Sequence, residues 1–233
     1  MMRRWSAMSR PVRELLRLVR DSRAVAMIEF AFIAPIILLM GLAGIEMANL
    51  AITHMRISQA AMHIADNASR IGDRDQLAAQ RVFEADINDL FIGVNIQAGE
   101  QVGLLENGRV ILSSLERNAD GGQTIRWQRC MGLKNATSEY GGQGTGATGT
   151  GFAGMGSGGN VLRAGTGQAI MFVEIVYDYQ PILDNAFTEP YISPPEIRSS
   201  AAFTVRGARD LSQVFQRTPA APVAACNRFT MTP

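Results

Sequence analysis

An apolar segment near the N-terminus constrains this chain more than any other feature of its sequence. From Ala24 to Ile45 it comprises 22 residues, and from Phe30 to Ile45 it contains no charged side chain. As an α-helix it would be about 33 Å long, enough to cross a hydrocarbon core of ~30 Å. The segment therefore predicts a transmembrane helix. A carboxylate in lipid costs a few kcal/mol, so Glu29, near the start of the segment, has two interpretations. It snorkels to the cytoplasmic interface or pairs with Arg23, or it pairs with a neighbouring chain in the membrane.

The charges on the two sides of this segment predict its orientation. Residues 1–23 carry seven arginines and two acidic residues, a net charge of +5, whereas residues 46–233 have a net charge of −3. By the positive-inside rule, the basic leader stays in the cytoplasm and the remainder crosses the membrane. A secretory signal peptide is disfavoured, because the apolar region is too long and no clear small-residue cleavage pattern follows it. The arginines are interpreted as a topology signal that contacts lipid headgroups, and no nucleic-acid partner is expected.

The numbers of cysteine and histidine residues limit which disulfides and metal sites the exported part can form. Cys130 and Cys226 are the two cysteines, and in an oxidising compartment they are expected to form a disulfide. Two buried thiols, or a bond to another chain, remain alternatives. With two histidines and no CxxC, no metal site is predicted. No catalytic constellation or cofactor is predicted either, since two GxGxxG matches at 144–154 lack the strand and helix that a dinucleotide site requires.

The organisation after the apolar segment predicts an α+β domain. An apolar stripe continues the helix to about Arg70, comprising Met47, Leu50, His54, Ile57, Ala61, Ile64, Ala68 and Ile71. A second helix is expected over 75–90. An Asn-Gly hairpin is expected at 107–108, another turn at 118–122, and further strands over 169–179 and 199–206, giving an antiparallel sheet of about five strands. Residues 141–159 contain ten glycines and are expected to form a flexible loop without packing of its own.

The expected domains follow from this reading. They are a basic cytoplasmic leader (1–23), a transmembrane helix (24–45), a helical stalk with the second helix (46–91), and an exported β-rich domain (92–233) that contains the glycine-rich loop.

The residues around the apolar segment also carry a resemblance. A basic leader, a small residue, four residues, Glu-Phe and an apolar helix with an early proline resemble the TadE-like pseudopilins of the tight adherence (Tad/Flp) pilus system, which are relatives of type IV pilins. Residues 24–31 read AVAMIEFA, where such families have a VAAIEFAL-type run. The resemblance covers roughly residues 23–49 and includes the helix residues Phe30, Pro35, Gly41 and Gly44.

The resemblance implies a type IV pilin-like protein without enzymatic activity. Prepilin peptidase would cut between Ala24 and Val25, although such families mostly have glycine before the cut. Glu29 would then be the fifth mature residue and would pair with the free α-amino group of an adjacent subunit. The implied partners are the major pilin, other pseudopilins, the inner-membrane assembly platform, prepilin peptidase and membrane lipid. The implied location is the bacterial inner membrane.

The alternative belongs to a different class of protein. It is a membrane-tethered periplasmic binding module that is neither processed nor assembled into a filament. In that case the glycine-rich loop and the Tyr177–Tyr179 region would form a ligand-binding surface.

Overall fold

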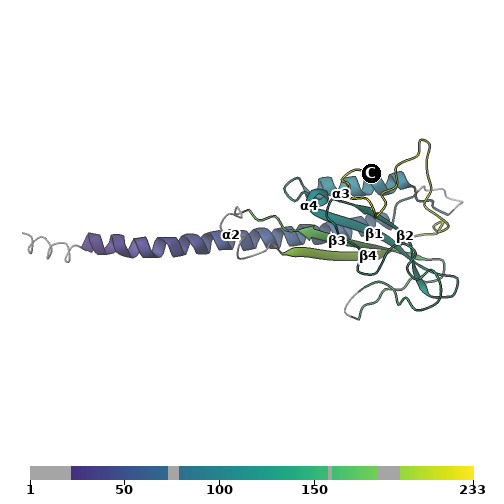
Figure 1. Ribbon diagram of the computed structural model, residues 1–233, viewed down its shortest axis with the longest axis horizontal. Coiled ribbons are helices and arrows are strands. Elements are labelled where there is room, and N and C mark those ends of the chain that lie inside the picture. The colour runs from purple at the N-terminus through teal and green to yellow at the C-terminus, as the bar shows by residue number, and fades with distance from the viewer. Residues whose placement is uncertain (1–21, 73–78, 157–158, 183–194) are drawn as a thin grey trace, which may run out of the picture. The chain divides into compact units, whose positions relative to one another are not determined.

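The computed structural model describes residues 22–72, 79–156, 159–182 and 195–233, in two compact units, residues 1–48 and 49–233. The described fold consists of a long helix, two shorter helices and a four-stranded sheet (Figure 1). The elements are α2 (Ser22–Ala68), α3 (Glu84–Ala98), α4 (Leu104–Asn107), β1 (Gly108–Arg117), β2 (Gln123–Met131), β3 (Ala169–Asp178) and β4 (Glu196–Thr204). The predicted fold class, α+β with a long apolar N-terminal helix and an antiparallel sheet, is confirmed. The sheet has four strands where about five were expected.

The sheet of the second unit has the strand order β2-β1-β3-β4, and every neighbouring pair is antiparallel. Because side chains alternate along a strand, each central strand contributes to two cores. Met171, Val173, Ile175 and Tyr177 of β3 belong to the larger core, together with buried residues of α2 and α3. Ile170 and Phe172 belong to a smaller core on the opposite face. Helices therefore cover one face of the sheet, and the other face needs a different cover.

The second half of α2 packs against the larger core along the predicted stripe. Ile57, Ala61, Ile64 and Ala68 are fully or almost fully buried. His54 is exposed, so the expectation that it lies in the packing face is wrong. The buried stripe instead includes Thr53, Ala60 and Ala65, which places its centre to one side of His54. The helix ends at Ala68, close to the predicted end, and the buried guanidinium of Arg209 donates to the carbonyls of Ala68 (3.1 Å) and Ile71 (2.7 Å).

The second helix begins later than the sequence predicted. It was expected over 75–90, of which 75–78 lie outside the described residues, and the structure places α3 at Glu84–Ala98. Residues 80 and 83 form isolated bridges with Arg209 and Phe215, so this stretch is extended. Glu84 and Asp86 occupy the first turn of α3, where negative charge is favoured, and Asp86 accepts a hydrogen bond from the backbone amide of Phe83 (3.3 Å).

The hairpin expected at Asn107-Gly108 is also wrong. Residues 104–107 form the short helix α4, and β1 begins at Gly108, so a helix and not a strand precedes β1 at this point. Leu104 and Leu105 are buried in the larger core, and this burial fixes the helical turn in place of a strand. The turn predicted at 118–122 is confirmed, because it joins β1 to β2 as neighbouring antiparallel strands.

The glycine-rich loop is packed, contrary to the expectation. It covers the second face of the sheet, where Met155 is fully buried and Phe152 packs against the smaller core. The side-chain amide of Asn118 donates to the carbonyls of Gly146 (2.8 Å) and Gly149 (2.7 Å). A Cβ on Gly146 would lie 2.3 Å from the carbonyl oxygen of Gln123, so glycine lets the loop backbone approach β2 closely.

The C-terminal segment is held along the free side of β2. Cys130 and Cys226 form a disulfide within the chain, as the sequence predicted. The backbone amide of Cys130 donates to Ala224 (2.8 Å), and that of Gly132 donates to Thr230 (2.8 Å). The segment therefore covers part of an edge that would otherwise present unpaired backbone groups.

A buried arginine reinforces this attachment. Arg109 is fully buried, and its guanidinium donates to the carbonyls of Gly132 (2.8 Å), Arg228 (2.8 Å) and Cys226 (2.7 Å). The ring of Phe229 lies 4.2 Å from the guanidinium carbon. Burial lowers the pKa of Arg109, and the three carbonyl dipoles and the aromatic face supply the stabilisation of the cation.

Candidate functional site

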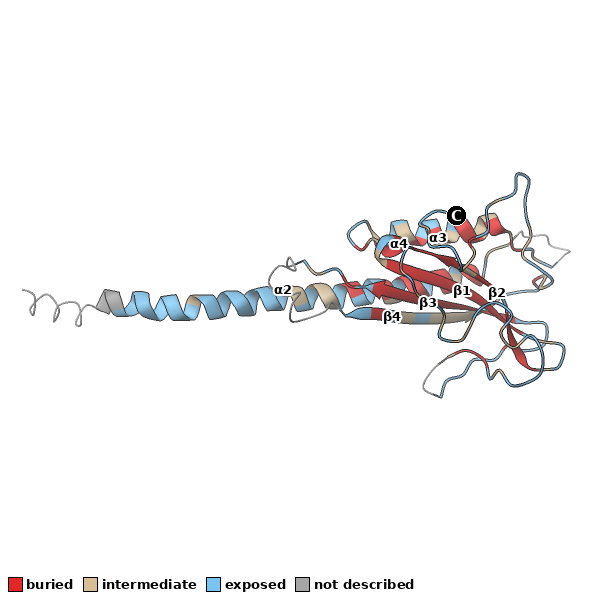
Figure 2. Ribbon diagram, in the orientation of Figure 1, coloured by how far each residue is buried: buried red, intermediate tan, exposed pale blue. Residues whose placement is uncertain are grey.

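The first half of α2 exposes apolar side chains on all its sides. Figure 2 shows this half mostly in pale blue, in contrast to the mostly red strands β1, β2 and β3. Its large apolar residues are exposed by 42% to 73% and comprise Val25, Met27, Ile28, Phe30, Phe32, Ile33, Ile36, Ile37, Leu38, Leu39, Met40, Leu42 and Ile45. A helix that is apolar all round needs lipid or protein around it. Among the described residues, this is the one helix that is long and apolar enough to cross a membrane. A single N-terminal apolar helix of this kind indicates a membrane anchor.

The residues predicted to act in this helix lie along it in sequence order. The Ala24–Val25 bond lies in the first turn of α2, and the Glu29 side chain is exposed on the following turn. Pro35 is accommodated inside the helix. At Gly41 and Gly44 a Cβ would meet no atom within 4 Å, and their spacing of three places both on one face. Another helix can approach closely at such a face. The structure thus keeps Glu29 and the glycines apart, on different turns of one helix.

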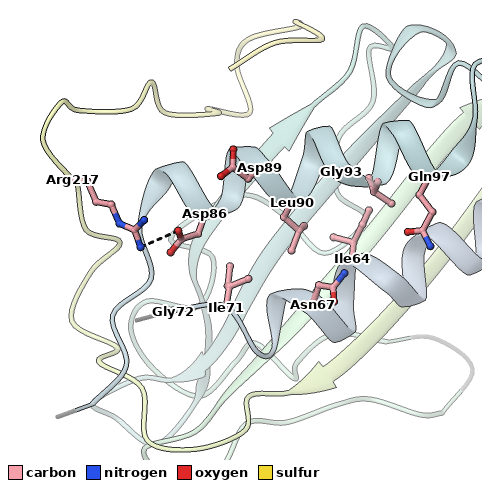
Figure 3. A pocket seen from close by; sticks show the side chains of 11 residues that line it. Ile64, Asn67, Ile71, Gly72, Asp86, Asp89, Leu90, Gly93, Gln97 and Arg217 are labelled. Carbon is pink, nitrogen blue, oxygen red and sulfur yellow. Dashed lines mark ion pairs between the residues drawn. The ribbon is translucent and has the colours of Figure 1, made fainter. Parts of the chain in front are cut away.

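A groove lies between the end of α2 and α3 in the second unit (Figure 3). Its volume is about 480 Å³, and Ile64, Ile71, Leu90 and Val94 provide its apolar surface. Asp86 lies at one end and forms an ion pair with Arg217 (3.2 Å). Sequence reasoning missed this groove, because the predicted second helix ended at residue 90. The available signal was Val94, which lies one helical turn after Leu90 and also lines the groove.

Three buried polar interactions of the second unit join separate segments of the domain. Arg129 forms a bidentate ion pair with Glu84, with 2.8 Å between Nε and Oε2, and this pair joins β2 to α3. Burial raises the pKa of Tyr177 to about 12, and its hydroxyl donates to the carbonyl of Val102 (2.7 Å). Burial also raises the pKa of Glu174, which accepts hydrogen bonds from the hydroxyl of Ser138 and the backbone amide of Glu139. Each of these groups fixes one segment of the domain to another.

The ligand surface of the alternative hypothesis is not formed. Tyr177 and Tyr179 are 1% and 3% exposed and belong to the larger core. Residues of the glycine-rich loop pack on the opposite face of the sheet, against the smaller core. The described residues also contain no group of three or more His, Cys, Asp or Glu side chains that could hold a metal ion.

The comparison with known proteins gave a match that lies within α2 and not in the sheet. The family model described as TadE-like protein matches residues 24–66, which cover the apolar half of α2 and nearly all of its packed half. Comparisons with the curated proteins and with solved structures gave no match. The resemblance predicted from the sequence is therefore confirmed for this segment. Residues 24–66 match the TadE-like family model, and this match covers less than half of the chain.

Proposed function

We propose that this protein takes part in the assembly of a Tad (Flp) pilus as a membrane-anchored pseudopilin. One observation carries the proposal: the segment that matches the TadE-like family contains the helix half whose apolar side chains lack cover within the chain's described residues. A subunit of this kind works by packing and lateral contacts. Its exposed helix provides the membrane anchor before assembly and the contact surface with other subunits afterwards.

The proposed topology follows from charge. Residues 1–23, with their net charge of +5, remain in the cytoplasm, and residues 49–233 fold in the periplasm. The disulfide between Cys130 and Cys226 supports this placement, because disulfides persist in oxidising compartments. The anchor then lies in the bacterial inner membrane.

The proposed maturation step is cleavage between Ala24 and Val25 by prepilin peptidase. The new α-amino group on Val25 and the carboxylate of Glu29 then lie at the start of an otherwise apolar helix. Pairing of Glu29 with the α-amino group of a neighbouring subunit neutralises both charges where lipid penalises each of them alone. The partners are the major pilin, other pseudopilins and the assembly platform of the inner membrane.

N-terminal sequencing and intact-mass measurement of the protein from its native membrane test this function. We expect a mature chain that begins at Val25 in cells with prepilin peptidase, and a full-length chain in cells without it. A full-length chain in both would contradict processing and would leave a stably anchored protein outside the filament.

Replacement of Glu29 tests the charge pair separately. We expect Glu29→Ala to leave membrane insertion intact and to lower surface piliation about tenfold or more, because an unpaired charge in lipid costs a few kcal/mol. The matched control is Glu106→Ala, which removes an exposed acid from α4. Quantification of sheared pili measures the effect, and normal piliation of the Glu29 variant would refute the pairing.

A further inference from the structure

Arg109 is a fully buried cation without an acidic partner. It is among the largest side chains that the domain buries completely, and no carboxylate in the described part of the chain forms an ion pair with it. Its Nε–H also has no hydrogen-bond acceptor within those residues. Burial of a charge costs free energy, and an apolar residue of similar size often serves a protein core as well. The groups that Arg109 does contact therefore have to explain its presence.

The hydrogen bonds of Arg109 join the two segments that carry the cysteines. Its guanidinium donates to the carbonyl of Gly132, two residues after Cys130, and to the carbonyl of Cys226 itself. A third bond goes to the carbonyl of Arg228. The planar guanidinium presents its donors in a fixed fork, so the three carbonyls are held in one arrangement. Arg109 thus holds the backbone on both sides of the disulfide.

The C-terminal segment bends at Cys226. The backbone amide of Arg228 donates to the carbonyl of Ala225 (3.1 Å), and this bond closes a turn that contains Cys226. The backbone amides of residues 130 and 132 donate to carbonyls on either side of the turn. None of these contacts uses a sulfur atom. The segment can therefore take its place on β2 before the covalent bond exists.

We propose that Arg109 selects the partner of Cys130, because it places the Cys226 thiol beside Cys130 before the disulfide forms. A disulfide-bearing oxidant forms a mixed disulfide with one cysteine, and the thiolate of the other attacks that cysteine's sulfur and displaces the oxidant as a thiol. In total the two cysteines lose two protons and two electrons, and the disulfide of the oxidant becomes two thiols. Because the second attack is intramolecular, it depends on the effective concentration of the second thiol. Arg109 raises this concentration and so favours the bond within the chain over a bond to another chain.

Equilibration with glutathione measures the effective concentration in the full-length chain. The protein is reduced in detergent micelles and equilibrated with mixtures of glutathione and glutathione disulfide, and the remaining thiols are alkylated and counted by intact mass. Arg109→Lys keeps the positive charge and loses the fork of donors. We expect it to lower the effective concentration about tenfold or more, which corresponds to the loss of one hydrogen bond to a charged group. We also expect disulfide-linked dimers of this variant on non-reducing gels.

Arg129→Lys is the matched control. Arg129 is also a largely buried arginine of the sheet, and the change breaks its bidentate ion pair with Glu84 without touching the C-terminal segment. We expect this variant to unfold at a lower urea concentration but to keep the effective concentration of the wild type. An equal loss in both variants would show that Arg109 acts through overall stability alone, and would overturn the proposal.

The double variant Cys130→Ser and Cys226→Ser tests the placement of the segment without a disulfide. Hydrogen exchange of the backbone amides at 130 and 132 reports whether the segment is in place, because both amides donate to it. We expect these amides to stay protected while Arg109 is present. They should exchange about tenfold faster or more when Arg109→Lys is added. Rapid exchange in the double variant itself would show that the disulfide positions the segment, and would contradict the role of Arg109.

This inference is independent of the pilus role, because purified protein provides every measurement. An unchanged effective concentration in Arg109→Lys overturns the role of Arg109 in disulfide formation. It leaves membrane anchoring, processing and piliation standing, since these are measured in cells.

Discussion

The two halves of α2 belong to one continuous helix but differ in how far their apolar side chains are buried. Between Val25 and Ile45 the large apolar side chains are exposed on every side of the helix. Between Asn49 and Ala68 the buried apolar residues follow one stripe, on which Ile57, Ile64 and Ala68 pack against the domain. Apolar residues off the stripe, such as Met55 and Met62, are exposed. Within the described residues the apolar surface of the first half has no cover, whereas one face of the second half is covered by the domain. A change in the angular width of the apolar surface, without any break in the helix, is enough to separate anchor from domain.

The largest expected effect distinguishes the two halves by added charge. Ile37→Arg combined with Met40→Arg places two cations in the apolar half, at a cost of about 6 kcal/mol for insertion into a membrane. We expect this variant to leave the membrane fraction. Met55→Arg combined with Met62→Arg makes the same change at exposed positions of the second half, and this variant should stay in the membrane fraction. Carbonate extraction and fractionation provide the measurement. Equal retention of both variants would break the distinction.

Truncation of an isoleucine should have its larger effect in the second half of α2, the reverse of the effect expected for added charge. Ile57 is fully buried, so Ile57→Ala should lower the free energy of unfolding by about 2–5 kcal/mol. Ile37→Ala removes the same atoms from an exposed position and should change domain stability by less than about 0.5 kcal/mol. Urea unfolding of the full-length chain in detergent micelles measures both. Similar losses from the two substitutions would show that the first half also packs on the domain.

Titration of Glu174 would sharpen the description of the domain. Burial raises its pKa above the ordinary value of 4.5, so the folded state binds this proton more tightly than the unfolded state. Its contribution to stability therefore increases as the pH falls from neutral, and the increase is complete below about 4.5. We therefore expect the free energy of unfolding of the wild type to rise relative to that of Glu174→Gln as the pH falls over this range. The rise should be up to about 1.4 kcal/mol per pH unit. Parallel pH profiles of the two proteins would contradict this assignment.

The smallest effect concerns the glycine of α3. Gly93→Ala should raise the free energy of unfolding by about 0.5–1 kcal/mol, because alanine is a better helix former and its Cβ meets open space. Gly99→Ala is the contrasting variant. Its φ of +88° disfavours a side chain, so this change should destabilise the domain. Thermal unfolding measures both, and a loss of stability in Gly93→Ala would mean that the domain itself requires the glycine.

Local patterns predicted the elements that are marked by a periodic run of side chains or by a turn. The apolar run fixed the anchor, alternation of side chains over 169–179 indicated β3, and the turn at 118–122 joined β1 to β2 as expected. The same patterns could not place the start of α3. Residues 80–83 are extended because they pair with Arg209 and Phe215, more than 125 residues away along the chain. Long-range pairing of this kind leaves no local periodicity.

The glycine-rich loop and the groove show the same limit at the level of sites. Composition indicated a flexible loop, but Asn118, on a different segment, holds its backbone carbonyls. The groove requires Ile64 and Leu90 to meet from two helices, and neither residue departs from an ordinary core pattern. Glu29, by contrast, is a prediction from the sequence alone, because a charge beside an apolar run is locally unusual. A residue that breaks a local pattern is visible in the sequence, whereas residues that only a packed fold brings together are not.

The hydrogen bonds of Arg109 have a consequence for the order in which the domain is built. Two of the three carbonyls that accept from its guanidinium belong to residues 226 and 228, which are synthesised 117 and 119 residues after Arg109. Until they arrive, the guanidinium on β1 lacks two of its three carbonyl acceptors. Completion of the fold therefore waits for the C-terminal segment, and a chain truncated before residue 226 would hold a buried charge with two acceptors missing.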